Sequence, residues 1–458
     1  MAEDLSLSPK AIVGSGMCIG CGSCAVAPQR SMAWDGHGLR KPAGEIAEPT
    51  TAFARTCPFS PAARDEDAIA AERFPVPAHV DARLGRYETA YVGHVAEAEF
   101  RANGSSGGLV SWVAAELLRS GKIDGVVHVV PTEGSGEVYF RYAVSRSLDE
   151  IARGARSRYF PVDMAAVLRE IRATPGRYAI VGVPCFIKAI NLLRAEDPVI
   201  HERVTHLLGL FCGHMKSARF VDSFAWQLDA DPQDVRAVEY RRKDASRPAN
   251  WYTAQLTLAD GSVRERDWWH LADGDWGAGF FQASACNWCD DVTAETADIA
   301  FGDAWVEPYS SDGRGTNVAV IRSAEIRDLV AAATRDGRLA MEQVDAAFIV
   351  GTQAAGFRQR REGLAYRLTW AKRGITPRKR VEPSARGLPW RRKLVYRARS
   401  HISAWSHRMA RLARWSGMPS IYVGWARAAL SFYAGVTYSR GRAGRFFDRL
   451  EGKAGSPD

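Results

Sequence analysis

The chain has 458 residues, of which 46% are hydrophobic and 25% charged, and this ordinary globular composition excludes a disordered or fibrous protein. It has no uninterrupted apolar run of about 18 residues, as a membrane-spanning helix needs, and its first residues lack the features of a secretory signal, so we expect a cytoplasmic protein. The net charge of +9 is uneven, because residues 370–458 carry +16 and the remaining residues −7. This argues against a nucleic-acid-binding surface over the whole molecule.

Residues 1–75 contain four cysteines but no long periodic run that would build a core of their own. Cys18, Cys21 and Cys24 are each separated by two residues, and this spacing wraps a short loop around one face of a [4Fe-4S] cluster. The interleaved glycines let the backbone approach the sulfides. Cys57, directly before a proline, can supply the fourth ligand. Zinc is the alternative, but zinc sites usually take two separated pairs of cysteines, so the spacing favours iron and sulfur.

From residue 87 onward the sequence alternates between strand and helix patterns. We expect strands over 89–95, 123–130, 178–183 and 204–211, and helices over 109–119, 163–171 and 186–194. Strands separated by helices predict a mainly parallel sheet covered by helices. Residues 235–263 alternate like antiparallel strands, and a strand at 318–321 precedes a helix at 324–334. The fold class is therefore mixed α/β with an antiparallel insert.

A loop of small residues, Asn103-Gly104-Ser105-Ser106-Gly107-Gly108, lies before the helix expected at 109–119. Backbone N–H groups exposed at a helix start favour a phosphate or pyrophosphate. It is not a Walker loop, because no Gly-Lys-Ser/Thr follows. Taken alone, a flexible turn with a serine cap accounts for the same residues more simply.

The other four cysteines are more widely separated. Cys185 begins a helix after one expected strand, and Cys212 follows another. The carboxyl ends of parallel strands open onto the same edge of a sheet, where ligands collect. Cys286 and Cys289 form a Cys-x-x-Cys pair that could complete four ligands there. The alternative for Cys185 and Cys212 is that each is a small apolar residue of the core.

A linker rich in proline and arginine, over 374–389, precedes a basic helical tail. A helix starting at Pro389 would carry its apolar face on Leu394, Ala398, Ile402, Trp405, Met409 and Leu412, with arginines on its other faces. Such a helix can lie peripherally on the anionic inner membrane surface, dock on a partner, or pack on the acidic body. Arg427 argues against a membrane span in the apolar segment that follows.

Several motifs of the chain occur together in one order. They are the Cys18/Cys21/Cys24 run, Gly104-Ser105-Ser106-Gly107-Gly108, Ser157-Arg158-Tyr159, Gly182-Val183-Pro184-Cys185, Gly209-Leu210-Phe211-Cys212, Cys286-Asn287-Trp288-Cys289-Asp290 and Ala297-Asp298-Ile299-Ala300-Phe301-Gly302-Asp303-Ala304-Trp305. In this combination the chain resembles the beta-subunit family of coenzyme F420-reducing hydrogenase and dehydrogenase, which also includes plant 7-hydroxymethyl chlorophyll a reductase. The resemblance covers about residues 10–325 and says nothing about the tail.

The resemblance implies an oxidoreductase with FAD beside two [4Fe-4S] clusters. It would pass electrons between a one-electron donor such as ferredoxin, or F420, and a two-electron small-molecule substrate. Carried over by position, a ferredoxin-like segment over 1–75 would hold one cluster on Cys18, Cys21, Cys24 and Cys57. The segment over 76–369 would hold the second on Cys185, Cys212, Cys286 and Cys289. FAD would lie along Asn103, Ser105, Ser106, Gly107 and Gly108, with Ser157, Arg158 and Tyr159 as further contacts.

No general acid can be named from the sequence. Asp303 fits a turn or cap better than a proton donor, and His214 fits packing or solvent better than a relay. Trp288, between two cysteines, could exclude water or simply pack in the core. The competing hypothesis is a zinc-stabilised binding protein without catalysis, which would use residues 370–458 to contact a membrane or nucleic acid. Because no nucleic-acid recognition module is visible, we do not expect nucleic-acid binding.

Overall fold

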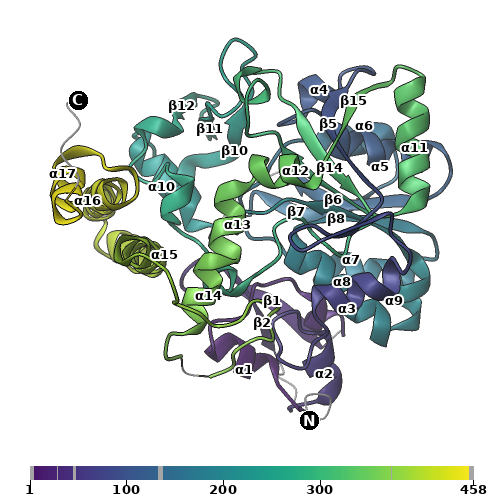
Figure 1. Ribbon diagram of the computed structural model, residues 1–458, viewed down its shortest axis with the longest axis horizontal. Coiled ribbons are helices and arrows are strands. Elements are labelled where there is room, and N and C mark those ends of the chain that lie inside the picture. Colours follow the sequence, from purple (N-terminus) through teal and green to yellow (C-terminus); the bar gives the residue numbers. More distant parts are fainter. Residues whose placement is uncertain (1–4, 28, 45–47, 133–137, 373, 453–458) are drawn as a thin grey trace.

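One eight-stranded sheet with helices on both faces forms the centre of the protein (Figure 1). The computed structural model describes residues 5–27, 29–44, 48–132, 138–372 and 374–452. The strand order is β15-β5-β14-β13-β9-β8-β6-β7. The strands are β5 (Thr89–Val95), β6 (Gly125–Pro131), β7 (Phe140–Ser145), β8 (Tyr178–Gly182), β9 (Val204–Leu210), β13 (Ile299–Asp303), β14 (Asn317–Ile321) and β15 (Leu339–Val344).

The sheet is mixed rather than mainly parallel, and this corrects the expectation from the sequence. Strands β6, β8, β9 and β13 pair in parallel. Strands β7, β14, β5 and β15 pair antiparallel at the two ends of this group. A parallel neighbour needs a long crossover, usually a helix, whereas an antiparallel neighbour does not. No α-helix lies between β6 and β7 or between β13 and β14 in the described part of the chain, so these strands turn back beside their predecessors.

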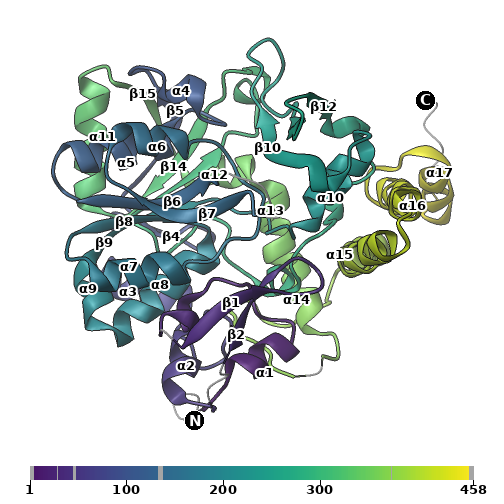
Figure 2. The same ribbon diagram turned by 180° about the vertical axis from the view of Figure 1, so that it is seen from behind.

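Helices cover the two faces of the sheet as the alternating pattern predicts (Figure 2). One face carries α5 (Leu109–Arg119) and α11 (Ala324–Arg335), and the other carries α7 (Ala165–Ala173) and α8 (Pro184–Glu196). Val126 and Ala179 belong to the core under α5, whereas their neighbours Val127 and Ile180 belong to the core under α7 and α8. Successive strand residues point to opposite faces, so both faces are buried.

The N-terminal segment has no separate core. It contains α1 (Pro9–Gly14), a hairpin of β1 (Arg30–Trp34) and β2 (Arg40–Gly44), α2 (Thr51–Thr56) and α3 (Glu66–Arg73), followed by the small pair β3 (His79–Asp81) and β4 (Gly85–Tyr87). Ile12, Phe53 and Phe59 pack in the same cluster as residues of α7 and α8. The segment is therefore held against one face of the sheet.

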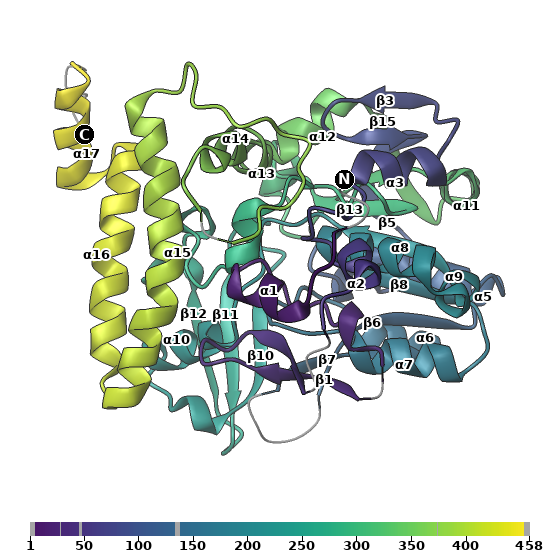
Figure 3. The same cartoon turned by 90° about the horizontal axis from the view of Figure 1, so that it is seen from below.

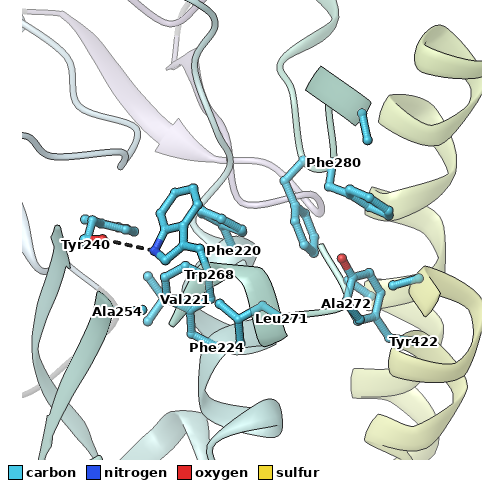
Figure 4. Packing of buried hydrophobic residues seen from close by; sticks show 14 of the residues in the cluster. Phe220, Val221, Phe224, Tyr240, Ala254, Trp268, Leu271, Ala272, Phe280 and Tyr422 are labelled. Atoms are coloured by element: carbon cyan, nitrogen blue, oxygen red, sulfur yellow. Dashed lines mark hydrogen bonds between the residues drawn. The ribbon is translucent and has the colours of Figure 1, made fainter. Parts of the chain in front are cut away.

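A three-stranded antiparallel sheet forms the insert. It consists of β10 (Val235–Arg242), β11 (Thr253–Leu258) and β12 (Val263–Asp267), and it packs with α10 (Arg219–Gln227) in an aromatic core. Figure 4 shows Phe220, Phe224 and Trp268 in this core, where the Trp268 Nε1 donates to the Tyr240 carbonyl oxygen at 3.0 Å. Tyr422 reaches the core from the C-terminal helices.

The C-terminal segment begins with α12 (Ala346–Thr352), α13 (Ala354–Arg360) and α14 (Glu362–Leu368), and it has the short α17 (Gly441–Leu450) at its far end. Between them, α15 (Trp390–Ser416) and α16 (Pro419–Tyr438) lie side by side as an antiparallel pair (Figure 3). Both contact α10. The described helices include none with the length and apolarity that crossing a bilayer requires.

The expected apolar face of α15 is right in part. Ala398 and Ile402 are buried against the body, and Leu394 and Met409 pack beside them. Trp405 and Leu412, however, are 45% and 41% exposed. The buried stripe of the helix runs instead through small residues such as Ala410 and Ala413, which allow close approach to the body.

Candidate functional site

The first four cysteines line one cavity. Cys18 and Cys21 lie in the loop after α1, Cys24 lies in the short 3-10 helix η1 (Ser23–Ala25), and Cys57 directly follows α2. Apolar side chains such as Met17, Ile19 and Phe59 complete the lining. The chain between Cys24 and Cys57 therefore folds back through the β1–β2 hairpin and α2, as a fourth ligand at Cys57 would require.

Two glycines let this loop turn tightly against its neighbours. Gly20 and Gly22 have φ angles of +79° and +83°. A Cβ atom on Gly20 would come within 2.5 Å of the carbonyl oxygen of Arg40 in β2, and one on Gly22 within 2.9 Å of the nitrogen of Ala165 in α7. Glycine meets both the conformational and the steric demand. The arrangement of the three cysteines thus depends on β2 and α7.

Burial makes these thiols weak acids. It raises the pKa of Cys21 to about 11 and that of Cys24 to about 12, and it raises the pKa of Cys57 well above the usual value of a thiol. Lys41 opposes the effect of burial on the pKa of Cys18, and its Nζ donates to the Cys18 carbonyl oxygen at 2.6 Å. A metal centre here would have to displace the thiol protons, because thiolates are the ligands.

The other four cysteines line a second cavity, at the carboxyl edge of the parallel strands. Cys185 lies in the first turn of α8 directly after β8, and Cys212 follows β9, which runs parallel to β8. Cys286 lies in the 3-10 helix η5 (Ser284–Trp288), and Cys289 follows it. All four cysteines line this cavity, together with Pro184 and Met215. The fold therefore brings them to a common centre.

Arg360, at the end of α13, lines the second cavity as well. Its Nη2 donates to the carbonyl oxygens of Cys212 and Gly213 at 2.7 and 2.9 Å, while its Nη1 has no hydrogen-bond partner among the described residues. The Met215 N–H donates to the Cys286 Sγ at 3.3 Å. Burial raises the pKa of Cys212 to about 12 and that of Cys286 to about 11, and Arg360 opposes both shifts. Such donors and positive charge stabilise sulfur ligands that carry negative charge.

The two cavities adjoin one another. Ile19 and Phe59 line both. The pKa of the Cys185 thiol is raised mainly by burial and by the cysteines of its own set, and Cys21 of the first set adds to the shift. Throughout the described ranges, no three His, Cys, Asp or Glu side chains form a group that could hold a single metal ion.

A buried ion network fixes the segment before α15 beside the second cavity. Asp290 accepts hydrogen bonds from the Lys379 Nζ and the Arg380 backbone N–H, both at 3.1 Å. Both terminal nitrogens of Arg380 donate to the Glu295 carboxylate, at 2.6 and 2.9 Å. These four side chains are almost inaccessible to solvent. The segment at 374–389, expected as a linker, is therefore anchored to the body at this point.

The glycine-serine loop contacts the Ser157–Tyr159 stretch. It follows the short helix α4 (Phe100–Asn103), and Asn103 itself is exposed. Ser105 Oγ accepts a hydrogen bond from the Ser157 backbone N–H at 2.7 Å. Ser106 Oγ donates to the Thr316 carbonyl oxygen at 2.8 Å.

The two glycines at the end of the loop are packed against backbone. A Cβ atom on Gly107 would lie 2.8 Å from the Asn317 nitrogen, and Gly108 has a φ angle of +86° at the start of α5. A side chain at either glycine would therefore meet the backbone of a neighbouring segment.

Two cations from β10 and its end contact this loop. The Lys243 Nζ donates to the Ser106 carbonyl oxygen at 2.9 Å, and the Arg241 Nη2 donates to the Ser105 carbonyl oxygen at 3.4 Å. Arg241 also pairs with Asp303 at 3.0 Å, so Asp303 serves as an ion-pair partner. Burial, together with nearby arginines, lowers the pKa of Lys243 to about 8.

Arg158 adds a third cation with unused donors. Its side chain is mostly buried, and its Nη1 lies 3.7 Å from Glu239. Neither its Nε nor its Nη1 finds a hydrogen-bond partner in the part of the chain that the structure describes. The Glu239 Oε1 likewise has no hydrogen-bond partner there, so Arg158 and Glu239 form a buried ion pair beside Tyr159.

A series of rings connects the loop with the second cavity. The Tyr159 ring lies 4.7 Å from the Trp276 ring, which stacks on His214 at 4.2 Å. His214 is buried and lies 3.3 Å from the Arg399 Nη2 of α15. His214 therefore packs between the two regions, as the simpler interpretation expects. Trp288 is half-buried and packs beside the second cysteine set.

Sequence reasoning missed several residues of this region. Arg360 and Arg380 lie far along the chain from the groups that they contact, and no motif marks them. Arg241 and Lys243 belong to an Arg-Arg-Lys run at the end of a strand, and this run was the available signal for an anion site.

Family models match most of the body of the chain. Both describe the beta subunit of coenzyme F420 hydrogenase/dehydrogenase. The model of its amino-terminal part matches residues 90–169, and the model of its carboxyl-terminal part matches residues 176–347. The matched residues make up more than half of the chain.

The individual relatives have low sequence identity to the chain. The chain is 27% identical over 312 residues to the coenzyme F420-dependent sulfite reductase of Methanocaldococcus jannaschii, covering 64% of this chain and 43% of that protein. It is 24% identical over 216 residues to one subunit of the F(420)H(2) dehydrogenase of Methanosarcina mazei, covering 46% and 56%. The chain thus spans about half the length of each of these two relatives. A chain of the F420-reducing [NiFe] hydrogenase complex from Methanosarcina barkeri superposes with a TM-score of 0.47 at 18% identity, covering 62% of this chain and 92% of that one.

Proposed function

The chain belongs to the coenzyme F420 hydrogenase/dehydrogenase beta-subunit family, and from this we propose that it is an iron-sulfur flavoprotein oxidoreductase. It would pass electrons between a one-electron donor, or F420, and a two-electron small-molecule substrate. The relatives are named as F420-dependent redox enzymes or their subunits, which supports an oxidoreductase.

The observation that carries the proposal is the pair of adjoining cavities, each lined by four cysteines. Cys18, Cys21, Cys24 and Cys57 would hold one [4Fe-4S] cluster, and Cys185, Cys212, Cys286 and Cys289 the other. Eight cysteines are present, and the two cavities account for all of them. Cubane clusters carry single electrons, and flavin exchanges electrons singly or as a hydride, so the combination suits this conversion.

The chain's own residues would tune and shield these centres. Ile19 and Phe59 line both cavities, so they would form an apolar boundary between the two clusters. Arg360 places a positive charge at the second cavity, and the Met215 N–H is directed at a sulfur ligand. Both features favour the reduced, more negative form of a bound cluster, because hydrogen bonds and positive charge raise its potential.

FAD would bind at the glycine-serine loop. Lys243, Arg241 and Arg158 would offer positive charge to a pyrophosphate, part of which Asp303 and Glu239 already balance. Ser105, Ser106, Gly107, Gly108, Ser157 and Tyr159 would line the ligand, and Asn103 would contact its solvent-exposed side. Tyr159, through Trp276, would separate the flavin from the second cavity by aromatic packing.

Cofactor content tests the proposal directly. Protein purified without oxygen should contain about eight iron atoms, about eight acid-labile sulfides and about one FAD per chain, and it should be brown and yellow. Metal, sulfide and flavin analysis measures this. A colourless protein that binds about one zinc ion per cysteine set, without flavin, would contradict the proposal and support a zinc-stabilised binding protein.

The donor can be identified on the same material. Reduced F420 and reduced ferredoxin are each mixed with the protein, and bleaching of the flavin absorbance is followed without oxygen. We expect one of the two to reduce the flavin within the dead time of manual mixing.

A further inference from the structure

The long helix α15 carries a second group of apolar and basic residues, on the side opposite the one that packs on the body. Trp405, Arg408, Leu412 and Trp415 are spaced by three, four and three residues, so they lie along one side of the helix. All four are exposed, and Trp415 is 84% exposed. Two tryptophans and a leucine on the solvent side of one helix form an unusual apolar stripe for a solvent-facing surface. We call these four residues the outer face.

The segment of sequence that carries the outer face is basic throughout. Residues 383–447 contain 13 Lys and Arg and no Asp or Glu. Some of these cations are used internally, as with Arg399 at His214 and Arg414 at Asp222. Arg408, in contrast, lies over the Trp405 ring at 5.1 Å and points to the same side as the apolar stripe. Arg411 is exposed next to it.

We propose that the outer face of α15 binds the surface of an anionic lipid bilayer. Trp405, Leu412 and Trp415 would enter the headgroup region, where tryptophan is favoured, and Arg408 and Arg411 would contact lipid phosphates. A helix of 27 residues is about 40 Å long. Its exposed side can lie along a flat membrane surface, so no groove on the partner is needed.

The charge pattern favours a lipid bilayer over a protein, a nucleic acid or a second copy of the chain. A segment with no acidic residue over 65 consecutive positions complements a uniformly negative plane, whereas protein interfaces usually carry a mixed polar rim. Nucleic acid would also match the charge, but it does not require three large apolar side chains on the contact face. A second copy of the chain would bring two positive surfaces together.

The test is sedimentation of the full-length, cofactor-loaded protein with vesicles. Vesicles of phosphatidylcholine with phosphatidylglycerol should bind the protein, pure phosphatidylcholine vesicles should bind it at least about tenfold more weakly, and added salt should release it. The Leu412→Ser/Trp415→Ser variant should lose at least about tenfold in partitioning, because it removes two of the three apolar contacts. The Arg408→Gln/Arg411→Gln variant should lose the preference for phosphatidylglycerol.

A matched control is available on the body. Trp269, in the 3-10 helix η3 (Trp268–His270), is 63% exposed and lies outside the outer face, so Trp269→Ser should bind vesicles like the parent protein. Iron and flavin content should be unchanged in all these variants, which separates the result from the proposed activity. Equal binding to both vesicle types, or unchanged binding by the Leu412→Ser/Trp415→Ser variant, would overturn the proposal. So would self-association or nucleic-acid binding that requires the same residues in the absence of vesicle binding.

Discussion

Replacing Cys185 with alanine should remove about half of the iron and acid-labile sulfide of the protein and abolish substrate turnover. Cys185 lies in the first turn of α8 and lines the second cavity with three other thiols. Its loss leaves three ligands for a cubane that takes four. The first cavity lies on the other side of Ile19 and Phe59, and its four cysteines are untouched. Iron and sulfide analysis, together with electron paramagnetic resonance of the reduced protein, measures the outcome.

The companion variants make this result specific. Met215→Leu changes a residue that lines the same cavity without removing a thiol, and the backbone N–H of residue 215 still donates to Cys286. We expect it to keep its full iron content. Cys57→Ala should give the opposite pattern, with loss of the first cluster and retention of the second. If Cys185→Ala keeps all of its iron and turns over substrate normally, the second set of cysteines does not hold a cluster.

Replacing Arg380 with alanine should destabilise the protein by about 3–5 kcal/mol. The Arg380 side chain donates two hydrogen bonds to Glu295 and one, from its Nε at 3.4 Å, to Asp290, and all three side chains are buried. Glu295 then keeps only Arg361, at 3.3 Å, as a charged partner among the described contacts. A buried carboxylate without its main partner is costly. Denaturant unfolding of the purified protein, followed by circular dichroism, measures the change.

Arg378, two residues earlier, supplies the control. It is 60% exposed and lies 3.5 Å from Asp65. An exposed pair of this kind contributes about 0–1 kcal/mol, so Arg378→Ala should unfold almost like the parent. Equal effects of the two substitutions would show that the network around Asp290 and Glu295 does not anchor the segment before α15.

Local sequence patterns predicted the central parallel strands of the sheet but not the antiparallel pairing at its two ends. Strands β6, β8 and β9 follow from short β-branched runs between helical segments. Strand β15 reads Leu-Ala-Met-Glu-Gln-Val, which is neither a continuous apolar run nor a regular alternation of apolar and polar residues. Among the described strands it pairs only with β5. Strands β7 and β13 went unrecognised as well, and with them the antiparallel pairs that make the sheet mixed. Partner choice in a sheet depends on tertiary contacts that a single segment does not encode.

In the candidate site, too, the sequence predicted what a local rule determines and missed what distant contacts determine. The convergence of Cys185 and Cys212 follows from one local rule, that parallel strands end at the same edge. The position of Arg360 follows from no local rule, because its partners at Cys212 and Gly213 lie nearly 150 residues earlier. Periodicity predicted that α15 is a helix, but its rotation is set by packing on the body. That rotation turned Trp405 and Leu412 outward.

The second cavity is completed late in the order of the chain. All four of its cysteines have been synthesised by residue 289, whereas Arg360, which lines the cavity with them, follows about 70 residues later. A ribosome adding about 5–20 residues per second would therefore complete the four thiols several seconds before this arginine. That interval would give the cluster proposed for this cavity access to the four thiols before Arg360 completes the lining.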